Sequence, residues 1–256
     1  MRSLLGELPE ITADIVERLR ERRPRVHCIT NPVAQTFTAN VLLAAGAIPS
    51  MTVSPREIVP FVRRCDALLV NLGMFDVERQ KAALAAIPVA NKKRTPWVLD
   101  PVYIDSSAPR AAFAKRLVAK KPTALRLNQH ELAALGGNSK DLAAFTRHTA
   151  NMNTVIGLTG ERDFVSDGTR LSTISNGAPM MAKVTAMGCA GSALVAACLA
   201  VEDDAWLATT AALTIFGIAG EVAAERSRGP GTFAVEIVDA LHALNHVTLI
   251  GKARVT

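Results

Sequence analysis

Ala67-Leu68-Leu69-Val70-Asn71-Leu72 is a short, largely apolar stretch whose composition predicts a strand buried on both faces. The residues after it, from about 77 to 89, are rich in helix formers and predict a helix. This unit recurs, so that short apolar runs alternate along the chain with longer helical stretches. Such alternation is typical of an α/β fold in which helices cover both faces of a mainly parallel sheet.

The other repeats extend from this stretch in both directions. The expected strands comprise residues 25–30, 49–53, 97–100, 124–127 and 154–159, and the expected helices lie near residues 11–23, 56–64, 109–120 and 129–135. After Thr159, residues 164–166 and 169–172 flank Asp167-Gly168, a turn pair that favours a hairpin and hence an antiparallel edge. From Ala190 onward we expect helices, including long ones over 204–225 and 233–247.

The length and composition predict one large domain, residues 1–256, because we find no linker, repeat or low-complexity segment. Hydrophobic residues make up 49% of the chain, but no uninterrupted apolar run approaches the roughly 20 residues of a membrane helix. The N-terminus, Met1 to Glu7, meets an acidic residue at once and lacks the apolar core of a signal peptide. We therefore expect a soluble, cytoplasmic protein without a membrane partner.

The cysteines and charges exclude other classes of protein. Cys28, Cys65, Cys189 and Cys198 are far apart and form no CxxC pair, which argues against a disulfide framework or a zinc site. The net charge of +6 is accompanied by only one Tyr and two Trp, so no aromatic set is available for stacking bases. We therefore expect no nucleic-acid partner.

Polar residues follow the predicted strands at the points where the strands end. They are Thr30 and Asn31, Asn71, Asp100, Asn128 and Glu131, and Thr159 with Gly160. In parallel sheets ligands collect at the carboxyl ends of the strands. Each of two sites has two interpretations. Asp100 either holds magnesium through water or caps the following turn. Asn128 and Glu131 either face a ligand or form a capping box.

A second stretch, Val184-Thr185-Ala186-Met187-Gly188-Cys189-Ala190-Gly191-Ser192, predicts a turn that opens a helix. The first amides of a helix lack intrahelical partners and suit an anion such as a transferring phosphoryl group. Cys189 would lie among them. Small residues before a helix can also serve close packing alone, and the usual dinucleotide and P-loop signatures are absent.

Several other polar or nucleophilic residues have simpler explanations. His27 lies within an expected strand and is predicted to be a packed core histidine, and Cys28, Cys65 and Cys198 are predicted to be inert core thiols. Asn31, Gln35, Thr36, Thr38 and Asn40 give one helix an unusually polar start, which could bind a neutral heterocycle or provide caps.

Taken together, these stretches resemble the hydroxyethylthiazole kinase family of the ribokinase-like superfamily over nearly the whole chain. The stretches are Val26-His27-Cys28-Ile29-Thr30-Asn31 with residues 35–40, Gly46-Ala47-Ile48-Pro49-Ser50-Met51, Trp97-Val98-Leu99-Asp100-Pro101-Val102, Arg126 with Asn128 and Glu131, Thr159-Gly160-Glu161 with Asp163 and Asp167-Gly168, Ile218-Ala219-Gly220-Glu221 and residues 223–231.

The resemblance implies a three-layer α/β/α ribokinase-like fold and ATP-dependent phosphorylation of the primary alcohol of 4-methyl-5-(2-hydroxyethyl)thiazole in thiamine salvage. It also implies magnesium and a homotrimer with active sites between subunits. By analogy, the thiazole would be bound by Met51, Ala186 and Asn31, and ATP by Arg126, Thr159 and Asn128. Magnesium would be organised by Asp100 and Glu131. The base would be Cys189, and the phosphoryl group would be held by the amides of Gly188, Ala190 and Gly191.

That Cys189 acts as the base is a hypothesis. In its support, the helix N-terminus is expected to lower the pKa of the thiol. The sequence departs from the family pattern at Ala186 and Met187, which replace Gly and Thr in Thr-Gly-Thr-Gly-Cys, and the turn is expected to be reshaped. Leu127 replaces Gly after Arg126, and Tyr103-Ile104-Asp105 replaces a Gly-rich segment. These changes leave two alternatives: a kinase for another small alcohol, such as a hydroxymethylpyrimidine kinase, or a catalytically weak thiazole- or nucleotide-binding protein.

Overall fold

A computed structural model describes residues 4–256 and contains one eight-stranded sheet with the strand order β2-β1-β3-β4-β5-β6-β7-β8. The strands are β1 (Arg25–Ile29), β2 (Ile48–Ser50), β3 (Ala67–Asn71), β4 (Trp97–Asp100), β5 (Ala124–Asn128), β6 (Val155–Thr159), β7 (Asp163–Ser166) and β8 (Leu171–Ile174). Strands β1 to β6 pair in parallel, whereas β7 and β8 pair antiparallel. The predicted α/β fold and its antiparallel edge are therefore confirmed. Residues 1–3, on which the prediction of no signal peptide partly rests, lie outside the described part.

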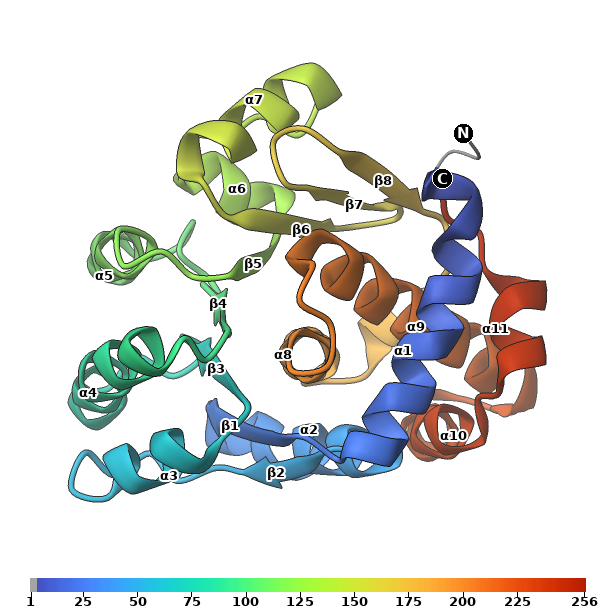
Figure 1. Cartoon of the computed structure of the whole chain (residues 1–256), viewed down its shortest axis with the longest axis horizontal. Coiled ribbons are helices and arrows are strands. Elements are labelled where there is room, and N and C mark those ends of the chain that lie inside the picture. The colour runs from blue at the N-terminus through green and yellow to red at the C-terminus, as the bar shows by residue number, and fades with distance from the viewer. Residues whose placement is uncertain (1–3) are drawn as a thin grey trace.

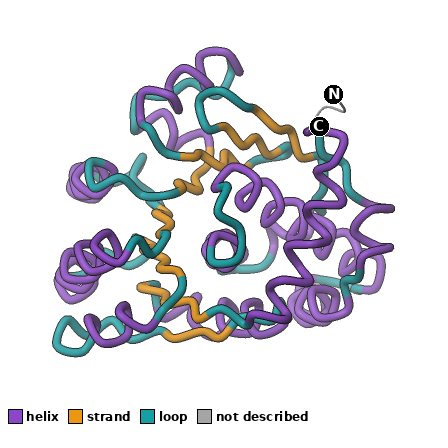
Figure 2. The backbone as a smooth tube through the Cα atoms, in the orientation of Figure 1, coloured by secondary structure: helices purple, strands orange, loops and turns teal. Residues whose placement is uncertain are grey.

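Helices cover both faces of the sheet (Figures 1 and 2). One face carries α3 (Ile58–Arg64), α4 (Val77–Lys93), α5 (Ala108–Val118), α6 (Gln129–Ala134) and α7 (Leu142–Met152), and the other carries α1 (Leu8–Arg22), α2 (Pro32–Ala44), α8 (Met187–Leu199), α9 (Ala205–Arg226), α10 (Pro230–Ala243) and α11 (His246–Lys252). Short 3-10 helices comprise Leu4–Glu7 and Pro179–Lys183. Each face encloses its own apolar core, which gives the expected three layers.

The C-terminal helices differ from the prediction at one point. We expected one helix over 233–247, but α10 ends at Ala243 and α11 begins at His246. Asn245 makes the break, because its side chain accepts a hydrogen bond of 2.9 Å from the amide of Thr248 and so caps the start of α11.

Helix α9 has the length and composition of a membrane span, with a mean hydropathy of 1.6 over its most apolar window. However, 83% of that window is buried inside the protein, where α9 packs against α1, α8 and α10. A helix enclosed by the core requires the same apolar composition as one enclosed by lipid. Burial in the core therefore explains the apolar character of α9.

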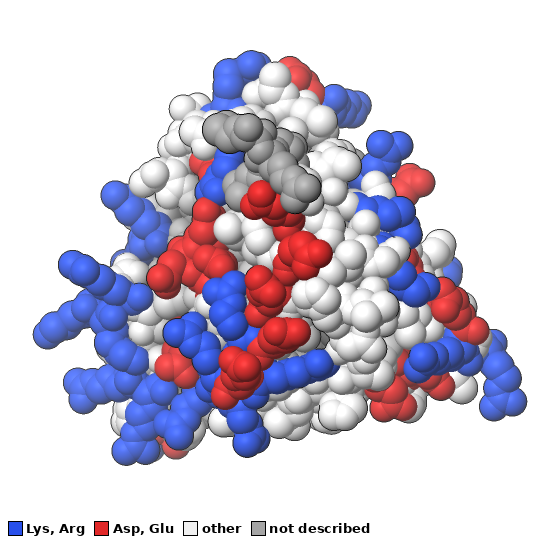
Figure 3. Space-filling view, turned by 45° about the vertical axis from the view of Figure 1, so that its right-hand side comes forward, with Lys and Arg blue, Asp and Glu red and all other residues white. Residues whose placement is uncertain are grey.

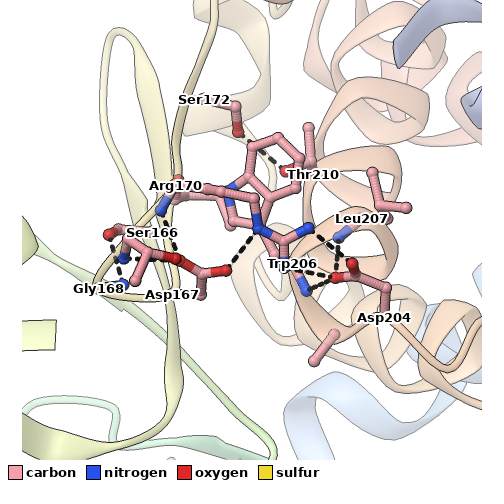
Figure 4. A network of polar contacts seen from close by, with 12 residues as sticks. Ser166, Asp167, Gly168, Arg170, Ser172, Asp204, Trp206, Leu207 and Thr210 are labelled. Carbon is pink, nitrogen blue, oxygen red and sulfur yellow. Dashed lines mark hydrogen bonds and ion pairs between the residues drawn. The ribbon is translucent and has the colours of Figure 1, made fainter. Parts of the chain in front are cut away.

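The first turn of α9 is tied to the β7–β8 hairpin by a cluster that we call the N-terminal clamp: Asp167, Arg170, Asp204 and Trp206 (Figure 4). The guanidinium of Arg170 donates to both carboxylate oxygens of Asp204, at 2.6 and 3.0 Å, and to Asp167 at 2.6 Å. It also lies 4.6 Å from the ring centre of Trp206. Asp204 in turn caps α9 by accepting from the amide of Trp206 at 3.0 Å.

Charged side chains of both signs lie on the surface. In Figure 3, Lys and Arg gather at the lower left of the face shown, and Asp and Glu lie toward its middle, interleaved with further Lys and Arg. Pairs of opposite charge join distant elements, as when Arg18 of α1 contacts Glu202 before α9 at 2.8 Å. Most charged side chains thus lie outside the two cores, whereas Asp100 and Glu131 are buried.

The register of the sheet places the polar strand ends side by side. Asn71 at the end of β3 pairs with Asp100 at the end of β4, and Asn128 at the end of β5 pairs with Thr159 at the end of β6. The N-terminal half of α8 lies close to this edge, since the Ser192 hydroxyl donates to Asp100 at 2.8 Å. The two stretches that the sequence singled out therefore meet in space.

Candidate active site

A cavity of about 500 Å³, the polar cavity, opens between the carboxyl edge of the sheet and the start of α8. Its lining consists of Asn31, Val33, Ala34, Gly73, Asp100, Val102, Tyr103, Arg126, Asn128, Glu131, Thr159, Thr185, Ala186, Gly188 and Cys189. It therefore brings together nearly all of the site residues that the sequence predicted, from stretches that are far apart in the chain.

Three predicted site residues lie elsewhere. Met51 follows β2 at the edge of the sheet and is half-buried against the core, outside the lining of the polar cavity. Ala190 is fully buried in the core beneath the first turn of α8. Gly191 faces a second cavity, beside Phe216.

The turn before α8 keeps the backbone that a glycine would adopt. Ala186 has a φ of +67°, in the left-handed region, so this turn places an Ala in a backbone conformation that favours glycine. The expected reshaping of the turn relative to the family stays a prediction. The amide of Ala190 donates to the carbonyl of Ala186 at 2.9 Å. The free amides are therefore those of Met187, Gly188 and Cys189, and our assignment of the Ala190 and Gly191 amides to the anion site was wrong.

A line of hydrogen bonds connects the thiol to the buried carboxylate. The Asn31 amide group lies 3.7 Å from Cys189 Sγ and 3.4 Å from the side-chain oxygen of Asn71. Asn71 Nδ2 donates to Asp100 Oδ2 at 2.7 Å, and the Ser192 hydroxyl donates to the same oxygen at 2.8 Å. Asn71 and Ser192 thus orient Asp100, a role that the sequence did not reveal, although Asn71 was recognised as a polar strand end.

The environment of Cys189 has the opposite effect on its pKa from the one we expected. Burial of the thiol and the nearby negative charge of Asp100 raise the pKa of Cys189 to about 11. These effects outweigh the lowering contributed by Asn71, Arg126 and Asn31. Cys189 is therefore a neutral thiol at pH 7, because burial destabilises the thiolate more than the helix start and these neighbours stabilise it.

The environment of Asp100 likewise disfavours its ionised form. Its side chain is only 3% exposed, and burial, together with the charge of Glu131, raises the pKa of Asp100 to about 6 in spite of Arg126, Ser192 and Asn71. Both of its hydrogen bonds fall on Oδ2, so Oδ1 has no protein donor among the described residues. Two carboxylates in one cavity, one with a free oxygen, fit a hydrated Mg²⁺, which takes few protein ligands. Among the described residues there is no cluster of three His, Cys, Asp or Glu side chains that could enclose a metal.

Glu131 and Asn128 form the capping box that the sequence allowed. The Asn128 side chain accepts from the amides of His130 and Glu131, and Glu131 Oε2 accepts from the amide of Asn128 at 2.9 Å. Glu131 Oε1 accepts from the amide of Tyr103 at 2.9 Å. Glu131 is thereby fixed at the cavity wall, and it holds the exposed Tyr103 at a left-handed φ of +59°.

Arg126 reaches from β5 across the start of α8. A Cβ built on Gly188 would lie 2.8 Å from its Nη1, so a larger residue there would displace the end of the Arg126 side chain. Arg126 Nε is buried without an acceptor, and the guanidinium makes no ion pair or hydrogen bond with the described residues. A guanidinium whose Nε is buried without a partner favours a bound anion, because the anion would supply the missing acceptor.

Arg126, Thr159 and Gly188 also line a second cavity of about 730 Å³, the large cavity. Its remaining wall comprises residues 160, 161 and 163, the segment Asn176, Gly177, Ala178, Pro179, Met181 and Ala182, and Met187, Gly191, Leu213, Phe216 and Gly217. Met187, which the sequence marked only as a departure from the family pattern, lines this cavity and is absent from the lining of the polar cavity. Residues 176–182, Leu213 and Phe216 carry no motif that predicts a site, since most of them are apolar and resemble core residues.

The remaining candidates lie outside the polar cavity, apart from Asn31, which lines it and also caps a helix. His27 is fully buried between the Ser50 hydroxyl at 2.7 Å and the Thr52 carbonyl at 3.1 Å, and burial lowers its pKa to about 4. Asn31 caps α2 by accepting from the amide of Ala34 at 3.0 Å. Gln35, Thr36, Thr38 and Asn40 do not line the polar cavity, and Cys28, Cys65 and Cys198 are buried.

Comparison with known proteins gives relatives over the whole length. The sequence profile described as the hydroxyethylthiazole kinase family matches residues 16–247. A probable hydroxyethylthiazole kinase from Agrobacterium fabrum (strain C58 / ATCC 33970) is 43% identical over 252 residues, which cover 98% of this chain and 97% of that protein. The structure of a hydroxyethylthiazole kinase protein from Pyrococcus horikoshii OT3 matches with a TM-score of 0.93 at 35% identity, covering 96% of this chain and 98% of that one. A ribokinase-like superfamily protein from Enterococcus faecalis V583 shares the fold, with a TM-score of 0.69 at 14% identity over 90% of this chain and 93% of that one.

Proposed function

Because this chain belongs to the hydroxyethylthiazole kinase family, we propose that it transfers the γ-phosphoryl group of ATP to the primary alcohol of 4-methyl-5-(2-hydroxyethyl)thiazole, a step of thiamine salvage. ATP is the co-substrate of such a kinase. The two cavities suit two substrates, because they meet at a shared wall and each has a volume in the range of small-molecule sites.

The observation that carries this proposal is the unpartnered guanidinium of Arg126 at the junction of the two cavities. A triphosphate that lies across the junction supplies the missing acceptors, since Arg binds phosphate oxygens through parallel hydrogen bonds. The apolar wall of the large cavity, with Met181, Leu213 and Phe216, suits the adenine ring. The thiazole alcohol then occupies the polar cavity beside Asn31, Ala186 and Cys189.

Catalysis in this arrangement depends on position and charge. The free amides of Met187, Gly188 and Cys189 point at the transferring group and stabilise its charge. The neutral Cys189 thiol contacts the alcohol and orients it. In a loose phosphoryl-transfer transition state the attacking alcohol keeps its proton until late, so no thiolate is required.

Asp100 and Glu131 would hold magnesium, Asp100 through its free Oδ1, and the ion would supply charge neutralisation on the phosphate oxygens. The raised pKa of Asp100 supports this assignment, because a cation would favour the ionised carboxylate in its buried position. Asn128 and Thr159 form the adjoining wall and are placed to contact the nucleotide.

A homotrimer in the cytoplasm, with residues 1–256 of each subunit acting as one domain, completes the proposal. Exposed apolar side chains gather on adjoining elements: Val33 and Leu43 on α2, Ile48 on β2 and Val235 on α10, with α2 lying against both neighbours (Figure 1). Such a surface is typical of an interface. It would bring Met51, which lies on the β2 side, toward the polar cavity of the next subunit. Light scattering of the purified protein should give three times the mass of 27.2 kDa.

The activity is tested by incubating the protein with ATP, magnesium and the hydroxyethylthiazole and by following phosphorylated thiazole by mass spectrometry. Hydroxymethylpyrimidine is the competing alcohol in a parallel reaction. Turnover of the pyrimidine alone would identify a kinase for another alcohol. Thiazole binding in calorimetry without turnover of either alcohol would identify a binding protein.

A further inference from the structure

The C-terminal end of α9 carries a second polar network, which we call the C-terminal network: Asn176, Gly177, Glu221 and Arg254. The carboxylate of Glu221 accepts from the amide of Gly177 at 2.8 Å and from Asn176 Nδ2 at 3.2 Å. It also pairs with the guanidinium of Arg254, which donates to the Ser175 carbonyl at 2.8 Å. Glu221 belongs to the stretch Ile218-Ala219-Gly220-Glu221, to which the proposed chemistry gives no task.

Glu221 does not line the large cavity, but the residues that it holds do. Asn176 and Gly177 begin the segment 176–182, which forms one wall of that cavity. Gly177 has a φ of +147°, a backbone conformation that glycine adopts readily. Its amide is thereby turned to Glu221, so the carboxylate fixes the point at which the wall begins.

Two glycines of α9 let the same wall lie directly on the helix. A Cβ built on Gly217 would be 2.7 Å from the backbone oxygen of Asn176, and one built on Gly220 would be 2.5 Å from the Met181 sulfur. Gly217, Gly220 and Glu221 thus form one surface, with two close approaches and one carboxylate that receives the amides. The wall residue Met181 is seated by this surface.

The C-terminal segment of the chain is hydrogen-bonded to β8 and to the C-terminal network. Thr256 exchanges two backbone hydrogen bonds with Thr173 of β8, at 2.7 and 3.0 Å, and the amide of Ser175 donates to the Arg254 carbonyl at 2.9 Å. Asn176 closes the link, because its side chain donates to the Lys252 carbonyl and accepts from the Arg254 amide at 2.8 and 2.7 Å. The last residues therefore extend the sheet and end where the cavity wall starts.

We infer that Glu221, supported by Arg254, is a positioning residue that sets nucleotide affinity by holding the 176–182 wall of the large cavity. This inference rests on the proposed function, in which the large cavity binds the nucleotide. Glu221 acts through Asn176 and Gly177 and touches neither the transferring phosphoryl group nor the alcohol. The network should therefore govern the KM for ATP and leave kcat and the KM for the thiazole unchanged.

The test compares Glu221→Ala, Glu221→Gln and Arg254→Gln with the full-length protein in steady-state kinetics and in calorimetric titration with ATP. Loss of the charged acceptor in Glu221→Ala should raise the KM and Kd for ATP about tenfold, with kcat at saturation and the thiazole KM within about twofold. Glu221→Gln retains an oxygen for the Gly177 amide and should recover part of the affinity. Arg254→Gln leaves α9 intact and should give a smaller increase, which serves if Glu221→Ala folds poorly.

Asp204→Asn is the matched control, because it weakens the N-terminal clamp at the opposite end of the same helix (Figure 4). It should lower the melting temperature and leave the Kd for ATP unchanged. An unchanged Kd for ATP in Glu221→Ala, or an equal rise in Asp204→Asn, would overturn the inference. If the wild-type protein binds ATP but phosphorylates no thiazole, the proposed function fails and the calorimetric comparison still decides the inference. A wild-type protein that does not bind ATP would overturn both.

Discussion

The polar cavity and the large cavity share Arg126, Thr159 and Gly188, yet they are built in different ways. Polar side chains at the ends of parallel strands and the first turn of one helix make the polar cavity. The segment 176–182 after the hairpin, together with Leu213, Phe216 and Gly217 of α9, makes about half of the lining of the large cavity. The difference separates two tasks: the polar cavity presents charge and donors to reacting groups, and the large cavity provides shape for a ring.

Removing the shared guanidinium should have the largest effect. Arg126→Ala should lower kcat/KM about a thousandfold, because one positive group at a transferring phosphoryl is worth ~10³ or more in rate. Both the ATP KM and kcat should change, since Arg126 faces both cavities. Arg126→Lys should recover only part of the rate. A change confined to one of the two kinetic parameters would place Arg126 in one cavity alone.

Asp100→Asn should separate activity from stability within the polar cavity. Kcat should fall about a hundredfold, as for loss of one preorganised charged group. The metal-free protein should become more stable at pH 7.5. The folded state retains the Asp100 proton up to a pH of about 6, whereas the unfolded chain releases it near 3.8. The stability contributed by this group is therefore complete below pH 3.8 and is lost as the pH rises through 6.

The difference between these pKa values corresponds to at most about 3 kcal/mol at ~1.36 kcal/mol per pH unit. Urea denaturation of the metal-free wild-type and Asp100→Asn proteins from pH 4 to pH 7.5 measures it. The gain in the variant should appear between pH 4 and 6. A variant that is less stable at pH 7.5 would contradict the sign.

Cys189→Ser tests whether the thiol is a base. Because the pKa of Cys189 is about 11, the thiol is neutral in the working range, and a hydroxyl that occupies the same position should retain kcat within about tenfold. A loss near a thousandfold, together with a wild-type rate that rises with pH toward 11, would instead identify the thiolate as the base.

Met187→Thr should distinguish the two cavities by substrate. Met187 lines the large cavity and not the polar cavity, so shortening its side chain should change the ATP KM about threefold. A change of this size corresponds to the contact made by one or two methylene groups. The thiazole KM should stay constant. A change in the thiazole KM alone would show that the side chain faces the polar cavity after all.

Ala186→Gly should have the smallest effect and should act on stability. Relief of the left-handed backbone at φ +67° gains about 1 kcal/mol, partly offset by the greater entropy of glycine in the unfolded chain. The melting temperature should rise slightly with kinetics nearly unchanged. A fall in melting temperature would mean that the Ala methyl contributes packing that outweighs the strain.

The sequence by itself determined the sheet, its antiparallel edge and the residues of the polar cavity. Hydrophobic periodicity, polar residues at strand ends and turn residues are patterns of residues that are near each other in the chain, so they can be recognised without the fold. Asp100 and Glu131 were identified because charged residues that follow apolar strands stand out from their neighbours, whereas Arg126 was identified through the family resemblance. Only the tertiary structure decided the large cavity and the direction of the pKa of Cys189. Met181, Leu213 and Phe216 have the same composition as core residues, so their exposure to a cavity depends on how the 176–182 segment folds onto α9. The pKa of the thiol depends on burial and on Asp100, which is remote in the chain and adjacent only in the folded protein.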